Sequence, residues 1–391
     1  MSFTFIGFQS RAARAARSAA NRGPTLICCR SHVRRISATV PHGVPRTCNG
    51  ARRVNTNRIP ELAHYDDATI RSDVLSRVTP AVLRGLVAHW PATQHGRTSP
   101  QAIIDYLRRL DNGSLVNAIL MPPEAEGRLG YNTAMSGFNF ARNRVTVSSV
   151  GEQILRYGAF ARAPAVAAQA ARIEECLPGF VAENPLPLLD PCVRPRLWLG
   201  NTITTPAHVD ETHNIACVVS GRRRFTLFPP EQIGNLYIGP VDFTPTGAPI
   251  ALPSLTEPDF ERFPRLRLAL QHAQVAELEP GDALYIPAQW WHQVESLSSC
   301  NVLVNYWWHP IAGEAVGASP VSDCLLHCML TLRRMPPEVR AGWRAAFEHY
   351  VFGPDAPRSD HIPPERRGVL GEITPELAQR IRAHLLGRLN G

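Results

Sequence analysis

Lysine is absent from this sequence of 391 residues, in which all 41 basic side chains are arginine. Reactions that need a primary amine are therefore excluded, among them Schiff-base chemistry, proton abstraction by a lysine base and phosphate binding by a P-loop lysine. Long hydrophobic runs are also absent: none approaches the roughly 20 residues that a membrane-spanning helix requires, so no membrane partner is expected. The absence of lysine and the abundance of alanine, glycine and proline are typical of a genome with a high GC content, and a bacterial source is the simplest interpretation.

Acidic side chains are absent from residues 1–60, which contain eleven arginines. The formal net charge of +8 consists of +11 in this segment and −3 in the other 331 residues, where 30 arginines face 33 acidic side chains. This charge balance outside the N-terminal segment gives no reason to expect a nucleic-acid partner for the core of the protein.

The N-terminal segment, residues 1–57, is rich in arginine, alanine and serine and shows no hydrophobic periodicity. Its composition is compatible with a mitochondrial transit peptide, with a disordered arm that contacts anionic polymers, and with an over-extended reading frame. We expect a disordered or artefactual tail without function, and hence a cytoplasmic protein. A genuine transit peptide would instead direct the chain to mitochondria.

The sequence also lacks the paired cysteine motifs of redox and zinc sites. Its nine cysteines are an odd number, and no two of them are spaced as C-x-x-C. Free thiols in a reducing compartment are therefore the expectation.

Residues 58–310 contain many short strand-like segments and few helices. One helix is expected over residues 99–111, where Ser99 is a suitable N-cap and Pro100 occupies the first helical position. Short strands between turn-forming residues are expected at 115–121, 138–147, 196–203, 215–220, 224–228, 275–278, 283–287 and 301–308. Many short strands without regularly alternating helices indicate a β-sandwich or barrel rather than a parallel α/β sheet.

Beyond residue 310 the pattern becomes helical. Helices are expected over 323–334, over 337–350 and from Thr374 onwards, with apolar residues recurring along one face. These apolar faces have to be buried, either against the barrel or against a second copy of the same chain.

The most informative segment is Thr205-Pro206-Ala207-His208-Val209-Asp210. Residues i and i+2 of a strand point to the same side, so His208 and Asp210 are expected to project together. His292, which follows two tryptophans in GDALYIPAQWWHQVESL, is a candidate third ligand from a neighbouring strand. Two histidines and one carboxylate on one side of a metal ion, with three positions left open, form the arrangement associated with non-haem Fe(II) oxygenases.

An arginine run, Arg222-Arg223-Arg224, begins the strand that follows this motif. Strand parity places Arg223 on the same side as Phe225 and Leu227, the more apolar and hence inward set. The two neighbouring arginines and Thr226 are expected to face outwards. An inward guanidinium could bind the distal carboxylate of 2-oxoglutarate through two hydrogen bonds.

Several segments together carry a resemblance to a known family: TPAHVDETHN, FTLFPPEQ, LYIGPV, PDFERFP, PGDALYIPAQWWHQVESL and VNYWW. Their order and spacing resemble the JmjC/cupin-like Fe(II)/2-oxoglutarate-dependent oxygenase family, and within it the asparaginyl hydroxylase that acts on hypoxia-inducible factor. The resemblance implies that His208, Asp210 and His292 are the catalytic iron ligands and that 2-oxoglutarate is the co-substrate.

The resemblance also assigns residues to the co-substrate pocket. It implies that Thr205 and Asn305 contact 2-oxoglutarate and that Asn214 lies beside it. The position of the family's distal-carboxylate lysine falls on Arg223, in agreement with the inward direction that strand parity gives to this side chain.

One position departs from the family pattern. The family enzyme uses a tyrosine from an earlier strand as a further carboxylate partner, whereas this chain has alanines in the corresponding region, residues 164–180. Either another residue fills the role, for which Tyr131 is a candidate, or the pocket is less polar.

We therefore predict a mainly β double-stranded β-helix of the cupin/JmjC jelly-roll type, with flanking helices and a helical C-terminal region. The expected limits are 1–57 for the tail, 58–310 for the oxygenase domain and 311–391 for a helical region that forms a homodimer. The expected activity is Fe(II)- and 2-oxoglutarate-dependent hydroxylation of a protein side chain or a small molecule. Two alternatives remain, a metal-binding cupin with non-redox chemistry and a catalytically silent barrel that binds peptides.

Overall fold

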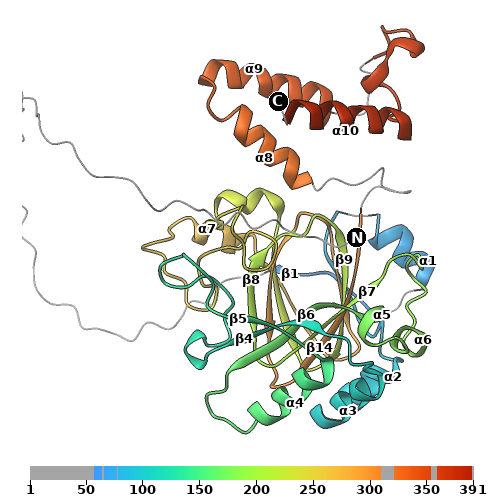
Figure 1. The fold of residues 1–391 in the computed structure, drawn as a ribbon, viewed down its shortest axis with the longest axis vertical. Helices are drawn as coiled ribbons and strands as arrows, with labels where there is room; N and C mark the ends of the chain where they lie inside the picture. Colours follow the sequence, from blue (N-terminus) through green and yellow to red (C-terminus); the bar gives the residue numbers. More distant parts are fainter. Residues whose placement is uncertain (1–56, 64–65, 77, 310–320, 354–358, 390–391) are drawn as a thin grey trace, which may run out of the picture. The chain divides into compact units, whose positions relative to one another are not determined.

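The computed structural model of this protein describes residues 57–63, 66–76, 78–309, 321–353 and 359–389 (Figure 1). The predicted N-terminal tail lies outside the described residues, apart from its last position, Asn57. The described part of the chain is rich in strands up to residue 309 and helical from residue 321.

The strands form two sheets, in which most neighbours are antiparallel. The five-stranded sheet has the order β1-β11-β10-β13-β8, and the nine-stranded sheet has the order β2-β3-β12-β9-β14-β7-β6-β4-β5. The strands of the first sheet are β1 (Asn57–Arg58), β8 (Thr204–His208), β10 (Arg223–Phe228), β11 (Gln274–Leu278) and β13 (Trp291–Ser296). Those of the second are β2 (Glu61–Leu62), β3 (Ala81–Leu83), β4 (Val116–Met121), β5 (Ala141–Val145), β6 (Ala165–Arg172), β7 (Pro195–Gly200), β9 (His213–Ser220), β12 (Ala283–Ile286) and β14 (Asn301–Trp308).

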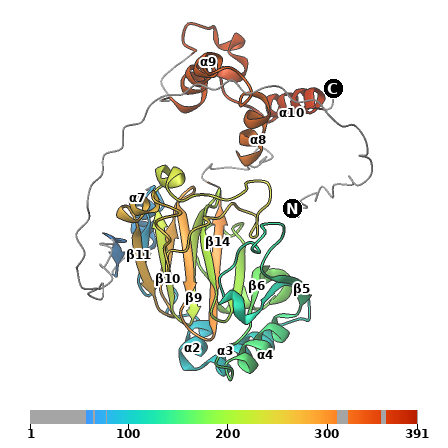
Figure 2. The ribbon, with the colours of Figure 1, turned by 90° about the vertical axis from the view of Figure 1, so that its left-hand side faces the viewer.

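A buried apolar layer lies between the two sheets. Phe225 and Leu227 of β10 contribute to it from the five-stranded sheet, and Leu284 of β12 and Leu303 of β14 contribute from the nine-stranded sheet. Removing such side chains from water is the main stabilising contribution to a two-sheet fold, at roughly 25 cal/mol per Å² of apolar surface. Figure 2 shows strands of both sheets, with β10 and β11 from the first and β9 and β14 from the second.

Helices cover the other face of the nine-stranded sheet. Three of them gather on one side of the strands in Figure 1: α2 (Pro91–Thr98), α3 (Pro100–Leu110) and α4 (Val147–Tyr157). Their buried faces join one large apolar cluster with the outward-facing residues of the sheet. The predicted N-cap of α3 is confirmed, because the Ser99 hydroxyl accepts a hydrogen bond of 3.1 Å from the backbone N–H of Ala102. Three short helices complete this part of the chain: α1 (Asp67–Thr69), α5 (Ile173–Cys176) and α6 (Phe180–Glu183).

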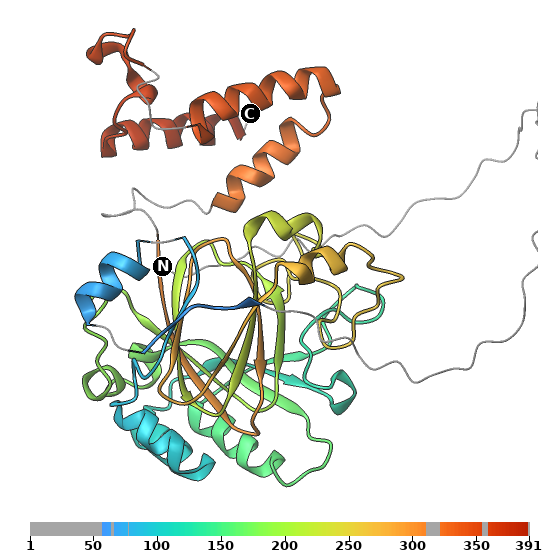
Figure 3. The same cartoon turned by 180° about the vertical axis from the view of Figure 1, so that it is seen from behind.

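The connection between β10 and β11 covers the outer face of the five-stranded sheet. It includes α7 (Leu266–Gln271), which is also seen from behind in Figure 3. Leu236, Ala251 and Leu266 of this connection are buried against Phe228 and Trp291 of the sheet. The connection therefore stabilises the sheet along this part of its length.

The same cover buries a side chain on the outer face of the five-stranded sheet. Thr226 lies on the outer face of β10, as strand parity predicts, but only 8% of its surface is exposed. The predicted outward direction of Thr226 is confirmed, and its low exposure arises because residues far along the chain pack over that face of the sheet.

The predicted fold class, two β-sheets with flanking helices and helices near the C-terminus, is confirmed. The elements that the sequence patterns miss include the strand β6 and the helices α2 and α4. β6 reads AVAAQAAR, and alanine is a poor strand former. α2 begins at Pro91, which resembles a turn residue but is well suited to the first position of a helix.

The helices near the C-terminus are α8 (Val321–Thr331), α9 (Pro337–Phe347) and α10 (Pro375–Leu389), close to their predicted positions. Neither α8 nor α9 contains a buried residue, and in α10 only Ala378 is buried. Within the described ranges, no helix is both long enough and apolar enough to cross a membrane.

Candidate metal centre

His208 and His292 are brought together by the pairing of two antiparallel strands. His208 is the last residue of β8 and lies directly opposite His292 of β13. Next to this pair the register shifts: the following pair is Thr205 with Val294, so three steps along β8 match two steps along β13. Residues directly opposite in an antiparallel pair share one face of the sheet, and the two imidazole ring centroids are 4.2 Å apart.

Both imidazole rings are held by the backbone. Nδ1 of His208 lies 2.9 Å from the carbonyl oxygen of Pro206, and Nδ1 of His292 lies 3.0 Å from the carbonyl oxygen of Trp290. A carbonyl oxygen can only accept, so each Nδ1 carries the proton and each Nε2 keeps its lone pair. This tautomer is the one that a metal ion bound at Nε2 requires.

Asp210 completes the cluster from just beyond the end of β8. It lies outside the strand, so the predicted alternation does not strictly apply to it. Its backbone carbonyl accepts a hydrogen bond of 3.0 Å from the N–H of Gln289, which fixes the chain at this point. Oδ2 of Asp210 lies 3.6 Å from Nε2 of His292, and it also accepts a hydrogen bond of 3.1 Å from the indole N–H of Trp307.

The ligand atoms of His208, Asp210 and His292 all lie within 4.8 Å of one another. No other group of three histidine, cysteine or carboxylate side chains within the described ranges has this arrangement. Burial, with a smaller contribution from the neighbouring His208, lowers the pKa of His292 to about 4, so its imidazole is neutral at physiological pH. Two imidazole nitrogens and one carboxylate oxygen fit a divalent cation such as Fe(II), Mn(II) or Zn(II).

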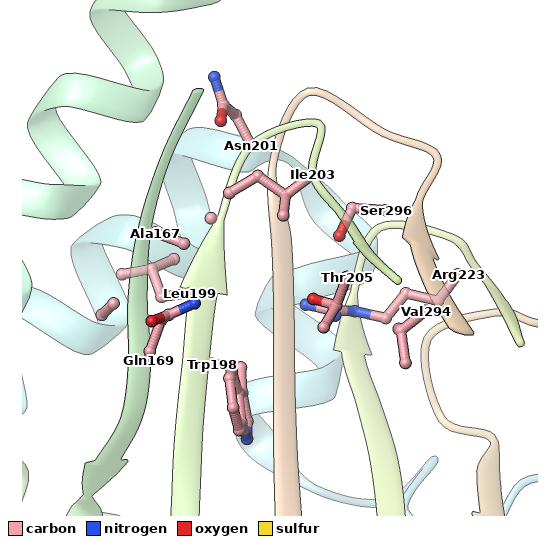
Figure 4. A pocket seen from close by; sticks show the side chains of 12 residues that line it. Ala167, Gln169, Trp198, Leu199, Asn201, Ile203, Thr205, Arg223, Val294 and Ser296 are labelled. Atoms are coloured by element: carbon pink, nitrogen blue, oxygen red, sulfur yellow. The ribbon is translucent and has the colours of Figure 1, made fainter. Parts of the chain in front are cut away.

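Arg223 points into the molecule, as strand parity predicts. Only 7% of its surface is exposed, and it lines a cavity together with Thr205, Val294 and Ser296 (Figure 4). Its neighbours Arg222 and Arg224 instead form ion pairs with Glu277 on the outer face of the sheet. The run of three arginines is therefore divided between the interior and the surface.

The guanidinium of Arg223 has no partner within the described residues. Its Nε is buried without a hydrogen bond, and no carboxylate lines the cavity. Burial lowers the pKa of Arg223 to about 10, which still leaves the side chain cationic at neutral pH. The nearby Cys300 thiol supplies no counter-charge, because burial raises its pKa to about 11. A buried cation without a counter-ion is costly, and a bound anion would remove that cost.

The structure separates the other predicted co-substrate residues. Thr205 lines the same cavity as Arg223. Asn305 and Asn214 are hydrogen-bonded to each other at 3.2 Å, and Asn305 also accepts a hydrogen bond of 2.8 Å from the indole N–H of Trp198. Trp198 lines the cavity, so the two asparagines lie behind one of its walls.

Tyr131, the candidate for the missing tyrosine, does not line this cavity. Its hydroxyl donates a hydrogen bond of 2.7 Å to the backbone carbonyl of Phe243, and its ring packs against Phe138 and Phe243. This suggestion from the sequence is therefore wrong. The residue that the sequence patterns miss is Gln169, which does line the cavity and is the one amide side chain in an alanine-rich strand.

The remaining histidine and tryptophan side chains near the cluster have packing roles. His213 contacts the hydroxyl of Tyr285 at 3.0 Å through Nδ1, and its ring packs against those of Tyr285 and Trp308, which also contact each other. Trp290 and Trp291 are buried in the apolar clusters on the two faces of the five-stranded sheet. Among the tryptophan side chains at positions 290, 291, 307 and 308, all within the described residues, only the indole of Trp307 has a hydrogen bond to a proposed metal ligand.

Comparison with known proteins extends these observations. The profile of the family described as "Cupin-like domain" matches residues 67–314, more than half of the chain. HSPB1-associated protein 1 of Homo sapiens is 33% identical over 147 residues, which cover 37% of this chain and 30% of the relative. "Lysine-specific demethylase JMJ31" of Arabidopsis thaliana is 38% identical over 112 residues, or 28% of this chain and 20% of the relative. "Jumonji C domain-containing protein 5" of Drosophila melanogaster is 37% identical over 114 residues, or 29% of this chain and 27% of the relative.

The matched segment spans less than a third of the length of each of these relatives. The similarity therefore concerns that segment and not the activities of the complete proteins. All three relatives are eukaryotic, so they give no support to the bacterial source that the composition favours.

Proposed function

Because the chain belongs to the cupin-like (JmjC) domain family, we propose that it is an Fe(II)- and 2-oxoglutarate-dependent dioxygenase. The family membership confirms what the sequence motifs predict. In this proposal His208, Asp210 and His292 hold the iron. Arg223 binds the distal carboxylate of 2-oxoglutarate, with Thr205 beside it and Asn305 and Asn214 supporting the cavity wall. The domain limits predicted above, 58–310 and 311–391, are part of the proposal.

The observation that carries the proposal is the position of Arg223 relative to the metal cluster. Arg223 lies opposite Ser296 of β13, and Leu227 lies opposite His292. Ser296 and His292 lie on the same face of β13 and are four residues apart, which corresponds to roughly 13 Å along a strand. A metal ion at one end and an arginine side chain reaching in from the other leave a gap suited to an extended five-carbon diacid.

The chain's own residues supply position and charge. The backbone contacts of His208 and His292 fix both rings with Nε2 towards the centre, and Trp307 holds one oxygen of Asp210 in place. Arg223 selects an anionic group in the cavity that it lines, because its guanidinium is a buried cation without a partner among the described residues. When bound, Fe(II) with 2-oxoglutarate and dioxygen would supply the oxidation of a C–H bond to an alcohol, with succinate and carbon dioxide as the co-products.

We propose a protein side chain rather than a small molecule as the substrate. The support comes from the names of two relatives, one of which is associated with another protein while the other is a demethylase of lysine. Peptides incubated with the enzyme, Fe(II) and 2-oxoglutarate are expected to gain one oxygen atom, as detected by mass spectrometry. Stimulation of 2-oxoglutarate turnover by small metabolites, but by no peptide, would favour the other substrate class.

The proposed activity is tested by succinate formation. Purified protein with Fe(II), 2-oxoglutarate and air is expected to form succinate above the rate of a protein-free control, and omission of iron should abolish the excess. His208→Ala should lose this activity, whereas His272→Ala, at an exposed histidine outside the cluster, should keep it.

Two other functions predict no succinate formation, and they differ from each other in what the protein binds. A cupin that uses its metal for non-redox chemistry would bind a divalent ion through the same three residues but would show no affinity for 2-oxoglutarate. A catalytically silent barrel would bind peptides equally well with and without metal. Arg223 favours the dioxygenase, because neither alternative gives this buried cation a partner.

We also propose that the chain forms a homodimer through its C-terminal helices. The support is a set of exposed apolar side chains on these helices: Leu325, Leu326, Leu330, Val339, Trp343, Leu385, Leu386 and Leu389. Apolar surface of this extent is usually covered in solution. Sedimentation velocity should give twice the monomer mass, and Trp343→Glu combined with Leu330→Glu should give the monomer.

A further inference from the structure

The cavity that contains Arg223 holds a second polar side chain without a partner. Gln169 reaches into it from β6 of the nine-stranded sheet, whereas Arg223 comes from β10 of the five-stranded sheet (Figure 4). No hydrogen bond within the described residues engages the side-chain amide of Gln169. Asn201, which also lines the cavity, differs in this respect, because its amide is bonded to the backbone of Val166 and Pro164.

A β-bulge gives Gln169 this position. Ala168 lies opposite Leu199 of β7 and Ala171 lies opposite Leu197, so three steps along β6 match two along β7. The extra residue is Ala170, whose φ of +46° is unusual for a residue with a side chain. Bulges redirect side chains and are frequent beside functional sites.

The bulge also explains how β6 contributes side chains both to the apolar cluster behind the sheet and to the cavity. Ala168 and Ala171 both belong to the large apolar cluster behind the sheet, although regular alternation would place them on opposite faces. Ala167, which lines the cavity, shares its face with Gln169. The irregular backbone therefore keeps Ala168 and Ala171 in the apolar cluster and turns Gln169, the one amide of this strand, towards the cavity.

The chemistry of the expected ligand calls for such a donor. A carboxylate has two oxygens with about four acceptor positions, and a guanidinium in the paired geometry occupies two of them. The Thr205 hydroxyl can donate to a third, and the NH₂ group of Gln169 can donate to a fourth. An amide suits this role because it has no ionised form that would repel the carboxylate.

We infer that Gln169 is a co-substrate-binding residue that donates a hydrogen bond to the distal carboxylate of a 2-oxo diacid, opposite Arg223. This inference rests on the proposed function and adds to it the residue that fills the place of the family's tyrosine. Gln169 thereby contributes to the preference for a dicarboxylate over a 2-oxo acid that ends in a methyl group.

The test is equilibrium binding, measured by calorimetry on Mn(II)-loaded protein. 2-Oxoglutarate is compared with 2-oxopentanoate, which has the same chain length but no distal carboxylate. Gln169→Ala is expected to weaken the binding of 2-oxoglutarate roughly 10-fold or more, the usual effect of losing a hydrogen bond to a charged group. The binding of 2-oxopentanoate and of Mn(II) should stay unchanged. Gln271→Ala, at an exposed glutamine, is the matched control and should bind both acids as the unaltered protein does.

The outcomes separate this inference from the function on which it rests. If the unaltered protein does not bind 2-oxoglutarate, the proposed function is wrong. If it does, and Gln169→Ala retains full affinity, Gln169 is no ligand of the carboxylate. Equal weakening for both acids would show a general effect on the cavity and would also contradict the inference. Gln169→Glu provides a further readout, because a second carboxylate beside Arg223 should exclude the diacid more strongly than alanine does.

Discussion

His208 and His292 lie opposite each other on two antiparallel strands. In each of them, Nδ1 donates a hydrogen bond to the carbonyl oxygen of the residue two positions earlier in the chain. Both rings are therefore held by the backbone at Nδ1, which leaves both Nε2 atoms available as ligands, and the two ring planes are inclined at 52°. Two imidazole nitrogens beside the carboxylate of Asp210 are suited to binding a metal ion.

The first prediction concerns metal binding by this cluster. His208→Ala and Asp210→Ala should each lower the affinity for Fe(II) or Mn(II) by several orders of magnitude, since each removes one of three ligands. Anaerobic metal titration measures this effect. Retention of metal by both variants would show that the ion, if bound, is held elsewhere.

The second prediction separates two adjacent tryptophans. Trp307→Phe removes the indole N–H that holds Oδ2 of Asp210, and loss of such a supporting bond lowers metal affinity by about 10–100-fold. Trp308→Phe should have little effect, because Trp308 contacts His213 and Tyr285 through its ring face. The same metal titration compares them, and a larger effect at position 308 would contradict the assignment.

The third prediction concerns the cost of burying Arg223. In the absence of an anion, Arg223→Met should raise the free energy of unfolding by about 1–3 kcal/mol, because a buried group without a hydrogen bond is replaced by an apolar side chain. Denaturant unfolding measures this difference. A less stable Arg223→Met protein would instead assign Arg223 a structural role.

Saturating 2-oxoglutarate should reverse the order of stability of these two proteins. The ligand stabilises only a folded protein that binds it, and Arg223→Met is expected to bind it poorly. Thermal unfolding with and without the diacid provides this control.

The fourth prediction concerns the turn that leads into β10. Gly221 has a φ of +73°, and a Cβ at this position would clash with the carbonyl oxygen of Cys300 and with the side chain of Asn301. Gly113 has a similar φ of +82°, but a Cβ there would meet no atom within 4 Å. Gly113→Ala should therefore cost about 1 kcal/mol from backbone strain alone, and Gly221→Ala clearly more. Equal shifts of the denaturation midpoint would show that the contact is relieved at little cost.

Local sequence rules were sufficient where a residue's direction depends on its own strand. The alternation in β10 predicts that Arg223 points inwards and that Arg224 points outwards, and both orientations are confirmed. The pairing of His208 with His292 is predicted by residue type and by the need for a third ligand. These features depend on a short segment or on chemical complementarity between two segments.

Other features depend on contacts between distant parts of the chain, and the sequence rules miss them. The orientation of Gln169 results from a register shift against β7, which no pattern within β6 reveals. Thr226 is buried because the connection after β10 folds back over its sheet. Tyr131 has the right residue type for the cavity, but its hydroxyl is bound to the backbone of Phe243.

The most direct test of the dioxygenase assignment is the affinity of the Mn(II)-loaded protein for 2-oxoglutarate, measured for the unaltered chain, Arg223→Ala and Arg222→Ala. The account predicts binding by the unaltered chain and by Arg222→Ala alike, since Arg222 forms an exposed ion pair with Glu277. Arg223→Ala should lose about 2–5 kcal/mol, or roughly 30-fold or more in affinity. Failure of the unaltered chain to bind 2-oxoglutarate, or equal binding by both variants, would contradict it.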